Sequence, residues 1–343
     1  MSQLPPVAWK LLLPLSWLFG LFVGIRNWFY DAGFMTRHKL PGIVISVGNI
    51  AVGGTGKSPL VIDFARRILA AGGTPAVVSR GYRSGLAAKE FQVLMDGRVI
   101  AGVSRSGVVA DEARMQSLAL PGVPVIVGAK RFDAVRDFLA AGPAKSVTHW
   151  ILDDGFQHRA IERDQDIVVV DARGVHGDLL PAGLFREPLT ALRRAHAVVL
   201  TKASQEFHIA AARTLIRSVA PQCAVYVASF ESEAPRQVAG PPVGPSPRWA
   251  LVSGIARPAD FQSALGRRGV LAVETFIYPD HQTFNAGDVL SRTSEFDAVI
   301  TTEKDWARDE AKFISLNLPV FVLPLTVSWR NEPALQFISK VHS

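Results

Sequence analysis

A glycine-rich segment at residues 51–58 has the residue types and spacing that bind phosphate. Its sequence, AVGGTGKS, follows an apolar run and precedes apolar residues at helical spacing. Backbone N–H groups of such a turn, together with the positive N-terminal end of a helix, surround phosphate oxygens. Lys57 would reach the β- and γ-phosphates, and the Ser58 hydroxyl would ligate Mg²⁺. The residues predicted to bind a nucleotide are Ala51, Val52, Gly53, Gly54, Thr55, Gly56, Lys57 and Ser58.

A pair of aspartates provides a second part of a phosphate-transfer site. Asp153 and Asp154 follow the apolar residues 150–152, and carboxylates at the carboxyl end of a parallel strand take the position of a Walker B ligand for Mg²⁺. Neighbouring residues of a strand point to opposite faces. We expect one aspartate to ligate Mg²⁺ together with Ser58 and the other to meet a helix end or a basic partner. A solvated turn at the strand end is the alternative.

Phosphoryl transfer also needs a group that orients or deprotonates the acceptor. Asp111 and Glu112 begin a predicted helix, where acidic residues often serve only as helix N-terminal charges. His281 follows a proline at position 279 and, taken alone, fits a surface turn. Spacing by itself therefore gives these three residues no role.

Strands and helices alternate along the part of the chain that must position these residues. Such alternation predicts an α/β fold, with a P-loop NTPase-like, mostly parallel sheet covered by helices on both faces. The predicted strands are residues 42–47, 75–79, 91–95, 99–101, 123–127, 147–152, 167–171 and 197–201, and the predicted helices are 59–71, 111–120, 131–141 and 206–219.

A proline-rich stretch suggests a boundary between two domains. We assign residues 36–232 to a P-loop core domain, 233–248 to a Pro-rich linker and 249–343 to a smaller C-terminal α/β domain. The pattern restarts after the linker, with strands predicted at 249–253, 270–276, 298–301 and 319–323 and a helix near 260–265.

The N-terminal residues 1–35 are predicted to form an apolar, membrane-associated helix. Residues 11–25 are uncharged and mostly apolar, and tryptophans flank them. A spanning helix needs about 20 apolar residues, so this run is too short, and no small-residue cleavage site follows it. Tryptophan prefers the membrane–water interface. We expect a segment that enters the membrane surface without spanning it; a buried helix packed on the core and a single-pass helix are the alternatives.

Net charge and composition limit the kinds of molecule that the protein is expected to bind. The net charge is +7, the isoelectric point is near 9.7, and 48% of the residues are hydrophobic. This balance favours a polyanionic partner: nucleic acid, an anionic membrane or a phosphorylated substrate. The single cysteine, Cys223, excludes an internal disulfide and a zinc site built from several cysteines. A protein without disulfides is typical of a reducing compartment.

Taken together, the motifs resemble those of the tetraacyldisaccharide 4'-kinases of lipid A biosynthesis. In the order of that family, and across nearly the whole chain, they are SVGNIAVGGTGKSP (46–59), SRGY (79–82), DEA (111–113), LDDGFQH (152–158), LPAG (180–183), REP (186–188), PDH (279–281) and TEKD (302–305). The GGTGKSP loop combined with DDGFQH is the most specific part. Ala51 replaces the first glycine of the loop motif, and Ala110 stands where the family usually has glycine.

The resemblance implies an ATP- and Mg²⁺-dependent kinase that phosphorylates the 4'-hydroxyl of tetraacyldisaccharide 1-phosphate. The product would be lipid IVA, formed at the cytoplasmic face of the bacterial inner membrane. Asp111 would be the catalytic base and His281 the partner that holds it, so that the two domains must approach each other around ATP. Positions near substrate or metal are implied for Asn49, Glu112, His158, Arg186 and Glu187.

The expected partners are the glycolipid and an anionic membrane surface, with no nucleic acid and no obligate protein partner. One competing interpretation is a membrane-associated P-loop NTPase of switch or metallochaperone type, because Thr201 and Lys202 end a strand where guanine-nucleotide switches read the base. Position 204 is serine, however, and lacks the carboxylate of such a motif. A nucleic-acid-binding module would need stacking aromatics on a basic stripe, whereas many aromatics here lie in the apolar N-terminal segment.

Overall fold

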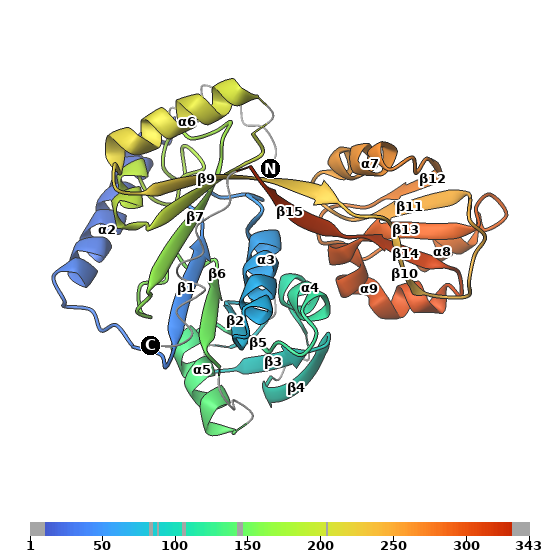
Figure 1. Ribbon diagram of the computed structural model, residues 1–343, viewed down its shortest axis with the longest axis horizontal. Helices are drawn as coiled ribbons and strands as arrows, with labels where there is room; N and C mark the ends of the chain where they lie inside the picture. The colour runs from blue at the N-terminus through green and yellow to red at the C-terminus, as the bar shows by residue number, and fades with distance from the viewer. Residues whose placement is uncertain are drawn as a thin grey trace.

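The computed structural model describes residues 11–81, 85–87, 89–104, 108–142, 147–203 and 205–330. Some expected features lie outside these ranges: residues 1–10 of the N-terminal segment, Tyr82 of the SRGY motif, Ser204, and residues 331–343 of the C-terminal domain. Within the described residues the chain forms two lobes that lie end to end (Figure 1).

The larger lobe is built on a ten-stranded sheet in the order β15-β9-β8-β7-β1-β6-β2-β5-β3-β4. The strands from β9 to β5 in this order run parallel, and antiparallel strands close both edges. The predicted mostly parallel α/β sheet is thereby confirmed. Its strands are β1 (Ile43–Gly48), β2 (Pro75–Ser79), β3 (Phe91–Met95), β4 (Arg98–Val103), β5 (Val125–Gly128), β6 (His149–Asp153), β7 (Gln165–Asp171), β8 (Ala197–Thr201), β9 (Ala224–Ser232) and β15 (Leu325–Trp329).

Helices cover both faces of this sheet, as expected for parallel strands that are apolar on both sides. Successive residues of β6 face opposite sides of the sheet. Ile151 packs in the hydrophobic cluster that contains residues of α3 and α4, whereas Trp150 and Leu152 pack in the cluster that contains residues of α5. Residues of β7 and β8 pack against α6 and η1. These helices are α3 (Lys57–Ala70), α4 (Asp111–Ala119), α5 (Arg131–Ala140), α6 (Glu206–Val219) and the 3-10 helix η1 (Leu189–Arg194).

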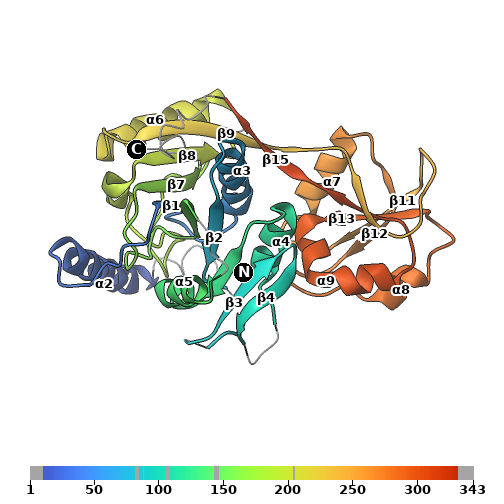
Figure 2. The same ribbon diagram turned by 60° about the horizontal axis from the view of Figure 1, so that its bottom comes forward.

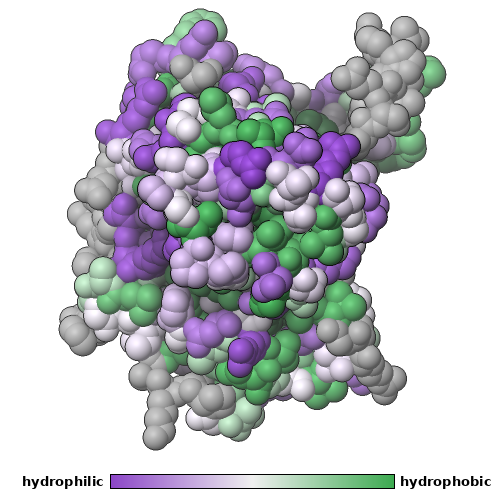
Figure 3. All heavy atoms as spheres, turned by 90° about the vertical axis from the view of Figure 1, so that its right-hand side faces the viewer, coloured by the Kyte–Doolittle hydropathy of each residue, from purple (hydrophilic) through white to green (hydrophobic). Residues whose placement is uncertain are grey.

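The smaller lobe has its own five-stranded sheet in the order β10-β14-β13-β11-β12. Three phenylalanines, Phe284, Phe296 and Phe313, fill much of its core. Polar and apolar residues are interspersed over its outer end (Figure 3). Its elements are β10 (Arg236–Ala239), β11 (Trp249–Ser253), α7 (Pro258–Arg267), β12 (Ala272–Ile277), α8 (Ala286–Leu290), β13 (Ala298–Thr302), α9 (Glu303–Ser315) and β14 (Val320–Leu323).

The chain passes between the lobes twice, and this differs from the expected domain ranges. Part of the proposed linker 233–248 forms β10, which pairs with β14 of the smaller sheet. The chain then returns, because β15 pairs with β9 of the larger sheet in the register Leu325↔Ser232 to Trp329↔Ala228. Residues 325–329 therefore belong to the larger lobe rather than to the C-terminal domain. The two connections run beside each other (Figures 1 and 2).

Helix α2 (Leu13–Asp31) lies at the edge of the larger lobe, with Pro14 in its first turn. Proline is compatible with that position, where the backbone N–H has no intrahelical acceptor. Among the described residues, α2 included, no helix is both long enough and apolar enough to cross a membrane.

Candidate active site

The phosphate loop connects β1 to α3 and leaves space for an anion at the start of that helix. Gly53 and Gly56 have φ angles of 123° and 89°, which a residue with a side chain rarely adopts. A Cβ at Gly53 or Gly54 would meet no other atom within 4 Å. At Gly56 a Cβ would instead lie 2.2 Å from the Phe230 ring of β9. The backbone is thus shaped as a phosphate cradle that is open on one side and closed on the other.

Side chains behind the loop hold its carbonyl groups. When loop N–H groups face an anion, the carbonyls point away and need donors of their own. The Thr201 hydroxyl donates to the Thr55 carbonyl over 2.9 Å, and Lys202 Nζ donates to the Gly54 carbonyl. Asn49 Nδ2 donates to Thr55 Oγ1 over 3.2 Å. Thr201 and Lys202 end β8 next to the loop, so the pair that resembled a base-reading motif braces the phosphate loop here.

The two adjacent aspartates meet different partners. Asp153 ends β6 on the side of α4, and its Oδ2 accepts a hydrogen bond from Gln116 Nε2 over 2.8 Å. Asp154 leaves the strand with φ 51°, and its Oδ1 lies 3.4 Å from Lys57 Nζ. Asp154 Oδ2 accepts from Arg186 Nη1 over 2.8 Å. The basic partner expected for one aspartate is therefore Lys57 together with Arg186, on Asp154.

These environments shift the two carboxyl groups in opposite directions. Burial raises the pKa of Asp153, and the Gln116 hydrogen bond and the Lys57 charge only partly oppose this. Burial also acts to raise the pKa of Asp154, but the charges of Lys57 and Arg186 outweigh it and hold that pKa below its usual value. Asp154 is thus an anion at neutral pH, in contact with the lysine of the phosphate loop.

The oxygen ligands near the loop fit Mg²⁺ bound jointly with a nucleotide. Mg²⁺ prefers oxygen ligands and usually takes only one or two carboxylates, with phosphates and water completing its shell. Within the described ranges, no group of three or more His, Cys, Asp or Glu side chains is arranged to hold a metal alone. Asp154 Oδ1 is buried and accepts no hydrogen bond there. Ser58, in the first turn of α3, adds a hydroxyl of the kind expected at such a site.

Asp111 and His281 come from different lobes and touch each other. Asp111 is the first residue of α4, and its Oδ2 lies 3.3 Å from His281 Nδ1. His281 has a φ of 65° and donates its backbone N–H to the Gly254 carbonyl over 3.1 Å. Ala110, before the helix, has φ −66° and ψ 127°, an extended backbone that any residue adopts. Alanine in place of the family's glycine is therefore compatible with the geometry of this loop.

The interface between α4 and α9 supports that pair. Arg114 of α4 donates to the Ala307 carbonyl of α9 over 2.9 Å and forms an ion pair with Glu310 of the same helix. Figure 2 shows α4 facing α9 across the junction of the lobes. The position of Asp111 relative to His281 thus depends on contacts between the lobes.

The remaining predicted site residues differ in their exposure to solvent. Glu112 is exposed beside Asp111, and Arg186 is partly exposed where it meets Asp154. Burial, with the charges of Arg131 and Arg163, lowers the pKa of His158 to about 3, so its ring is neutral at physiological pH.

Two predicted substrate residues have internal partners instead. Asn49 and Glu187 are fully buried. Glu187 accepts from Asn27 Nδ2 of α2 over 2.9 Å and from Arg194 Nη2 over 2.7 Å. A carboxylate enclosed in this way ties α2 to the larger lobe and does not face an open site. Asn49, as described above, braces the phosphate loop, so both residues have internal partners and their contacts with substrate stay a prediction.

Two site residues carried too weak a sequence signal to be found. Arg131 begins α5, is 2% exposed, and donates from both terminal nitrogens to the Asp154 carbonyl, over 3.1 and 3.2 Å. Gln116 of α4 holds Asp153, as described above. Each is a common polar residue on a helix, and only the fold shows that it faces the end of β6.

Helix α2 attaches to the larger lobe through a side that contains the buried residues Ser16 and Val23, and it leaves most of its large apolar side chains exposed. The Ser16 hydroxyl donates to the Leu179 carbonyl and accepts from the Ala182 N–H, both over 2.9 Å. Most of the large apolar side chains of α2 are exposed, which favours the predicted membrane-surface segment over a hydrophobic helix buried on the core. The exposed apolar side chains of α2 and its flanks are Leu11, Leu15, Trp17, Leu18, Leu21, Phe22, Ile25, Trp28, Phe29 and Phe34.

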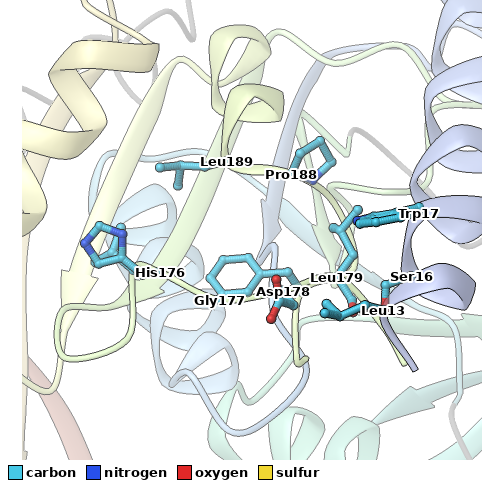
Figure 4. A pocket seen from close by; sticks show the side chains of 11 residues that line it. Leu13, Ser16, Trp17, His176, Gly177, Asp178, Leu179, Pro188 and Leu189 are labelled. Atoms are coloured by element: carbon cyan, nitrogen blue, oxygen red, sulfur yellow. Dashed lines mark hydrogen bonds between the residues drawn. The ribbon is translucent and has the colours of Figure 1, made fainter. Parts of the chain in front are cut away.

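A cavity of about 330 Å³ lies between α2 and the segment 175–189. Leu13 and Trp17 of α2 face Leu179, Pro188 and Leu189 across it (Figure 4). The same segment carries Arg186, so the cavity is connected along the chain to the ion pair with Asp154.

Comparisons with known proteins agree with this geometry. The sequence profile of the family described as "Tetraacyldisaccharide-1-P 4'-kinase" matches residues 8–342. The "Tetraacyldisaccharide 4'-kinase" of Chlorobium luteolum is 36% identical over 88% of this chain and 87% of its own length. That of Chlorobaculum tepidum is 34% identical, covering 93% of this chain and 92% of its own. The crystal structure of an "apo" form of LpxK from Aquifex aeolicus in complex with ATP superimposes with a TM-score of 0.72 at 28% identity, covering 96% of this chain and 98% of the other.

Proposed function

Because the chain belongs to the tetraacyldisaccharide-1-P 4'-kinase family, we propose that its site transfers the γ-phosphate of ATP to the 4'-hydroxyl of tetraacyldisaccharide 1-phosphate, forming lipid IVA. The observation that carries the assignment is the Asp111–His281 pair, which adds an acceptor-activating group to a phosphate loop. The switch or metallochaperone interpretation is not favoured, since such proteins need no second lobe that contacts the carboxylate at the start of α4.

The phosphate half of the site binds ATP and neutralises its charge. Backbone N–H groups of the phosphate loop and of the start of α3 would surround the phosphates, and Lys57 would contact the γ-phosphate. Ser58 and one of the two adjacent aspartates would hold Mg²⁺, which supplies charge neutralisation at the phosphate oxygens when bound. The Lys57–Asp154 contact keeps the lysine at the loop before nucleotide arrives.

The acceptor half activates the sugar hydroxyl. Phosphoryl transfer has a loose transition state in which the hydroxyl proton is lost late, so a carboxylate placed beside the hydroxyl is a sufficient base. Asp111 takes this role, and His281 restrains the carboxylate through the 3.3 Å contact. Positioning and charge neutralisation then supply most of the rate.

We propose that α2 lies in the cytoplasmic surface of the bacterial inner membrane, where a tetraacylated substrate resides. Its exposed side carries Trp17, Phe22 and Trp28, and such aromatic residues favour the interface. The positive net charge favours an anionic leaflet. The cavity beside α2 is lined mainly by apolar residues and could hold part of an acyl chain.

A phosphorylation assay tests the kinase assignment. Purified protein with Mg²⁺ and ATP should convert tetraacyldisaccharide 1-phosphate into a product with one additional phosphate, detected by mass spectrometry and located at the 4'-position by fragmentation. Hydrolysis of ATP without lipid phosphorylation would instead support the switch-type NTPase.

Sedimentation with vesicles tests the membrane assignment. The double variant Trp17→Ser/Phe22→Ser should bind vesicles of mixed neutral and anionic phospholipids more weakly than the wild type, because it loses two exposed apolar groups. Phe207→Ser removes an aromatic side chain that is 74% exposed on α6 and is the matched control. Equal loss of binding in control and double variant, or no loss in either, would contradict attachment through α2.

A further inference from the structure

Lys304, in the TEKD motif, contacts the side of His281 that faces away from Asp111. Its Nζ lies 3.3 Å from His281 Nε2 and 3.3 Å from Asp280 Oδ1. The other ring nitrogen, Nδ1, lies 3.3 Å from Asp111 Oδ2. A lysine, an imidazole and a carboxylate from α9, the 279–281 turn and α4 therefore form a continuous chain of contacts.

The chemistry of these groups determines where the imidazole proton lies. A lysine ammonium has three N–H donors and no acceptor, so His281 Nε2 must accept from Lys304. A neutral imidazole carries its single proton on the other nitrogen, so Nδ1–H donates to Asp111. In the part of the chain that the structure describes, Asp280 also faces the ring. Its Oδ2 lies 3.7 Å from Nε2, and its Oδ1 contacts Lys304 Nζ.

The positions of Lys304 and His281 are fixed relative to each other by shared backbone contacts. Lys304 lies in the first turn of α9, where the Thr302 side chain accepts from the Asp305 N–H over 3.0 Å. Asp305 is 1% exposed and accepts from the Gly254 N–H over 3.1 Å. The Gly254 carbonyl accepts from the His281 N–H over 3.1 Å. The start of α9 and the histidine turn are thus held by the same glycine.

We propose that Lys304 is a positioning residue that holds His281 in the tautomer with hydrogen on Nδ1, so that the ring donates to Asp111 and keeps its carboxylate oriented toward the acceptor. The proposal rests on the proposed function only for its effect on the rate. The tautomer follows from the contacts themselves and can be measured without any substrate.

Nuclear magnetic resonance of the full-length protein with ¹³C,¹⁵N-labelled histidine tests the tautomer directly. The ring signals of His281 are assigned by their loss in His281→Gln. At neutral pH the wild type should show the Nδ1–H tautomer, and Lys304→Arg, which keeps a cationic donor, should preserve it. Lys304→Met removes the donor at similar length and should shift the ring toward the Nε2–H form. An Nε2–H ring or an imidazolium in the wild type, or no change in Lys304→Met, would overturn the proposal.

Kinetics test whether the tautomer matters for phosphoryl transfer. Lys304→Met should lower kcat about tenfold, less than the roughly 10²–10⁴-fold contribution of a general base because Asp111 itself remains, and change KM for ATP less than about twofold. In the His281→Ala background the same substitution should have no further effect, because the two residues act through one contact. An additive loss would show that Lys304 acts on its own and would overturn the proposal.

A control on the same helix separates this effect from a general loss of folding. Lys312 of α9 donates to Thr283 Oγ1 over 3.0 Å and to the Phe284 carbonyl, within the smaller lobe. Lys312→Met should leave the His281 ring signals and kcat unchanged, and a change equal to that of Lys304→Met would overturn the proposal. If the wild type phosphorylates no lipid but shows the Nδ1–H ring, the proposed function fails and the tautomer assignment stands.

Discussion

The two halves of the site are assembled in different ways. In the phosphate half, Lys57, Asp154 and Arg186 all lie in the larger lobe, and the loop that carries Lys57 follows a central strand. In the acceptor half, Asp111 and His281 are 170 residues apart and belong to different lobes. A phosphate cradle can form wherever one strand, one turn and one helix fold correctly, whereas the acceptor half exists only when the lobes meet. Substitutions should therefore separate ATP binding from catalysis.

Lys57→Ala should have the largest effect of the comparison, because it removes the charge from the centre of the phosphate half. We expect kcat/KM for ATP to fall by about 10²–10³-fold, the scale for losing one preorganised electrostatic contact, together with weaker ATP binding by calorimetry. Lys130→Ala, at an exposed lysine of the same lobe, is the control. Unchanged ATP affinity would show that the loop does not bind nucleotide as described.

His281→Ala should affect only the acceptor half. We expect kcat to fall by about 10–100-fold, since the carboxylate loses its orienting contact, while the Kd for ATP changes little. In the Asp111→Ala background the loss should largely disappear, because the two residues act as a unit. Weakened ATP binding in His281→Ala would mean that the two halves are not separable.

Substitutions of the two adjacent aspartates should have the smallest effects, and they should change the stability of the folded protein in opposite directions. Asp154 has a lowered pKa, so its charge contributes stability above the ordinary aspartate pKa, and this is lost as pH falls through the lowered value. Asp153 has a raised pKa, so the folded protein loses stability as pH rises through the raised value. At neutral pH without nucleotide, Asp154→Asn should lower Tm and Asp153→Asn should raise it, each by about 2 °C.

Thermal unfolding followed between acidic and neutral pH checks this contrast. The differences from wild type should shrink toward acidic pH, where both carboxyl groups are protonated in the wild type. Shifts of the same sign in the two variants, or shifts that do not depend on pH, would contradict the assigned environments.

The sequence was sufficient to predict those parts of the site whose chemistry depends on residues close together in the chain. Residues 51–58 predicted the phosphate loop because glycines, lysine and serine act there through their own backbone and helix end. Asp153 and Asp154 were recognised because they follow a buried strand. The role of the Asp111–His281 pair came only from family resemblance, since nothing near either residue indicates a partner in the other lobe.

The sequence was insufficient to predict features that depend on packing between residues far apart in the chain. Pairing of β15 with β9 joins segments nearly a hundred residues apart, and neither strand was predicted as part of the larger sheet. Helix α9 was also missed, although Thr302 three residues before Asp305 is a recognisable N-terminal cap. Arg131 acts by reaching the backbone of another element, and no spacing within the chain encodes that contact.

A single-turnover measurement with Asp111→Asn tests the central claim most directly. Protein saturated with ATP and Mg²⁺ is mixed with tetraacyldisaccharide 1-phosphate, and formation of the phosphorylated lipid is followed over time. We expect the rate to fall by at least about 10²-fold relative to the wild type, with the Kd for ATP unchanged, while Glu162→Gln at an exposed carboxylate of the larger lobe behaves as wild type. A near-wild-type rate in Asp111→Asn would show that the acceptor hydroxyl is activated by another group.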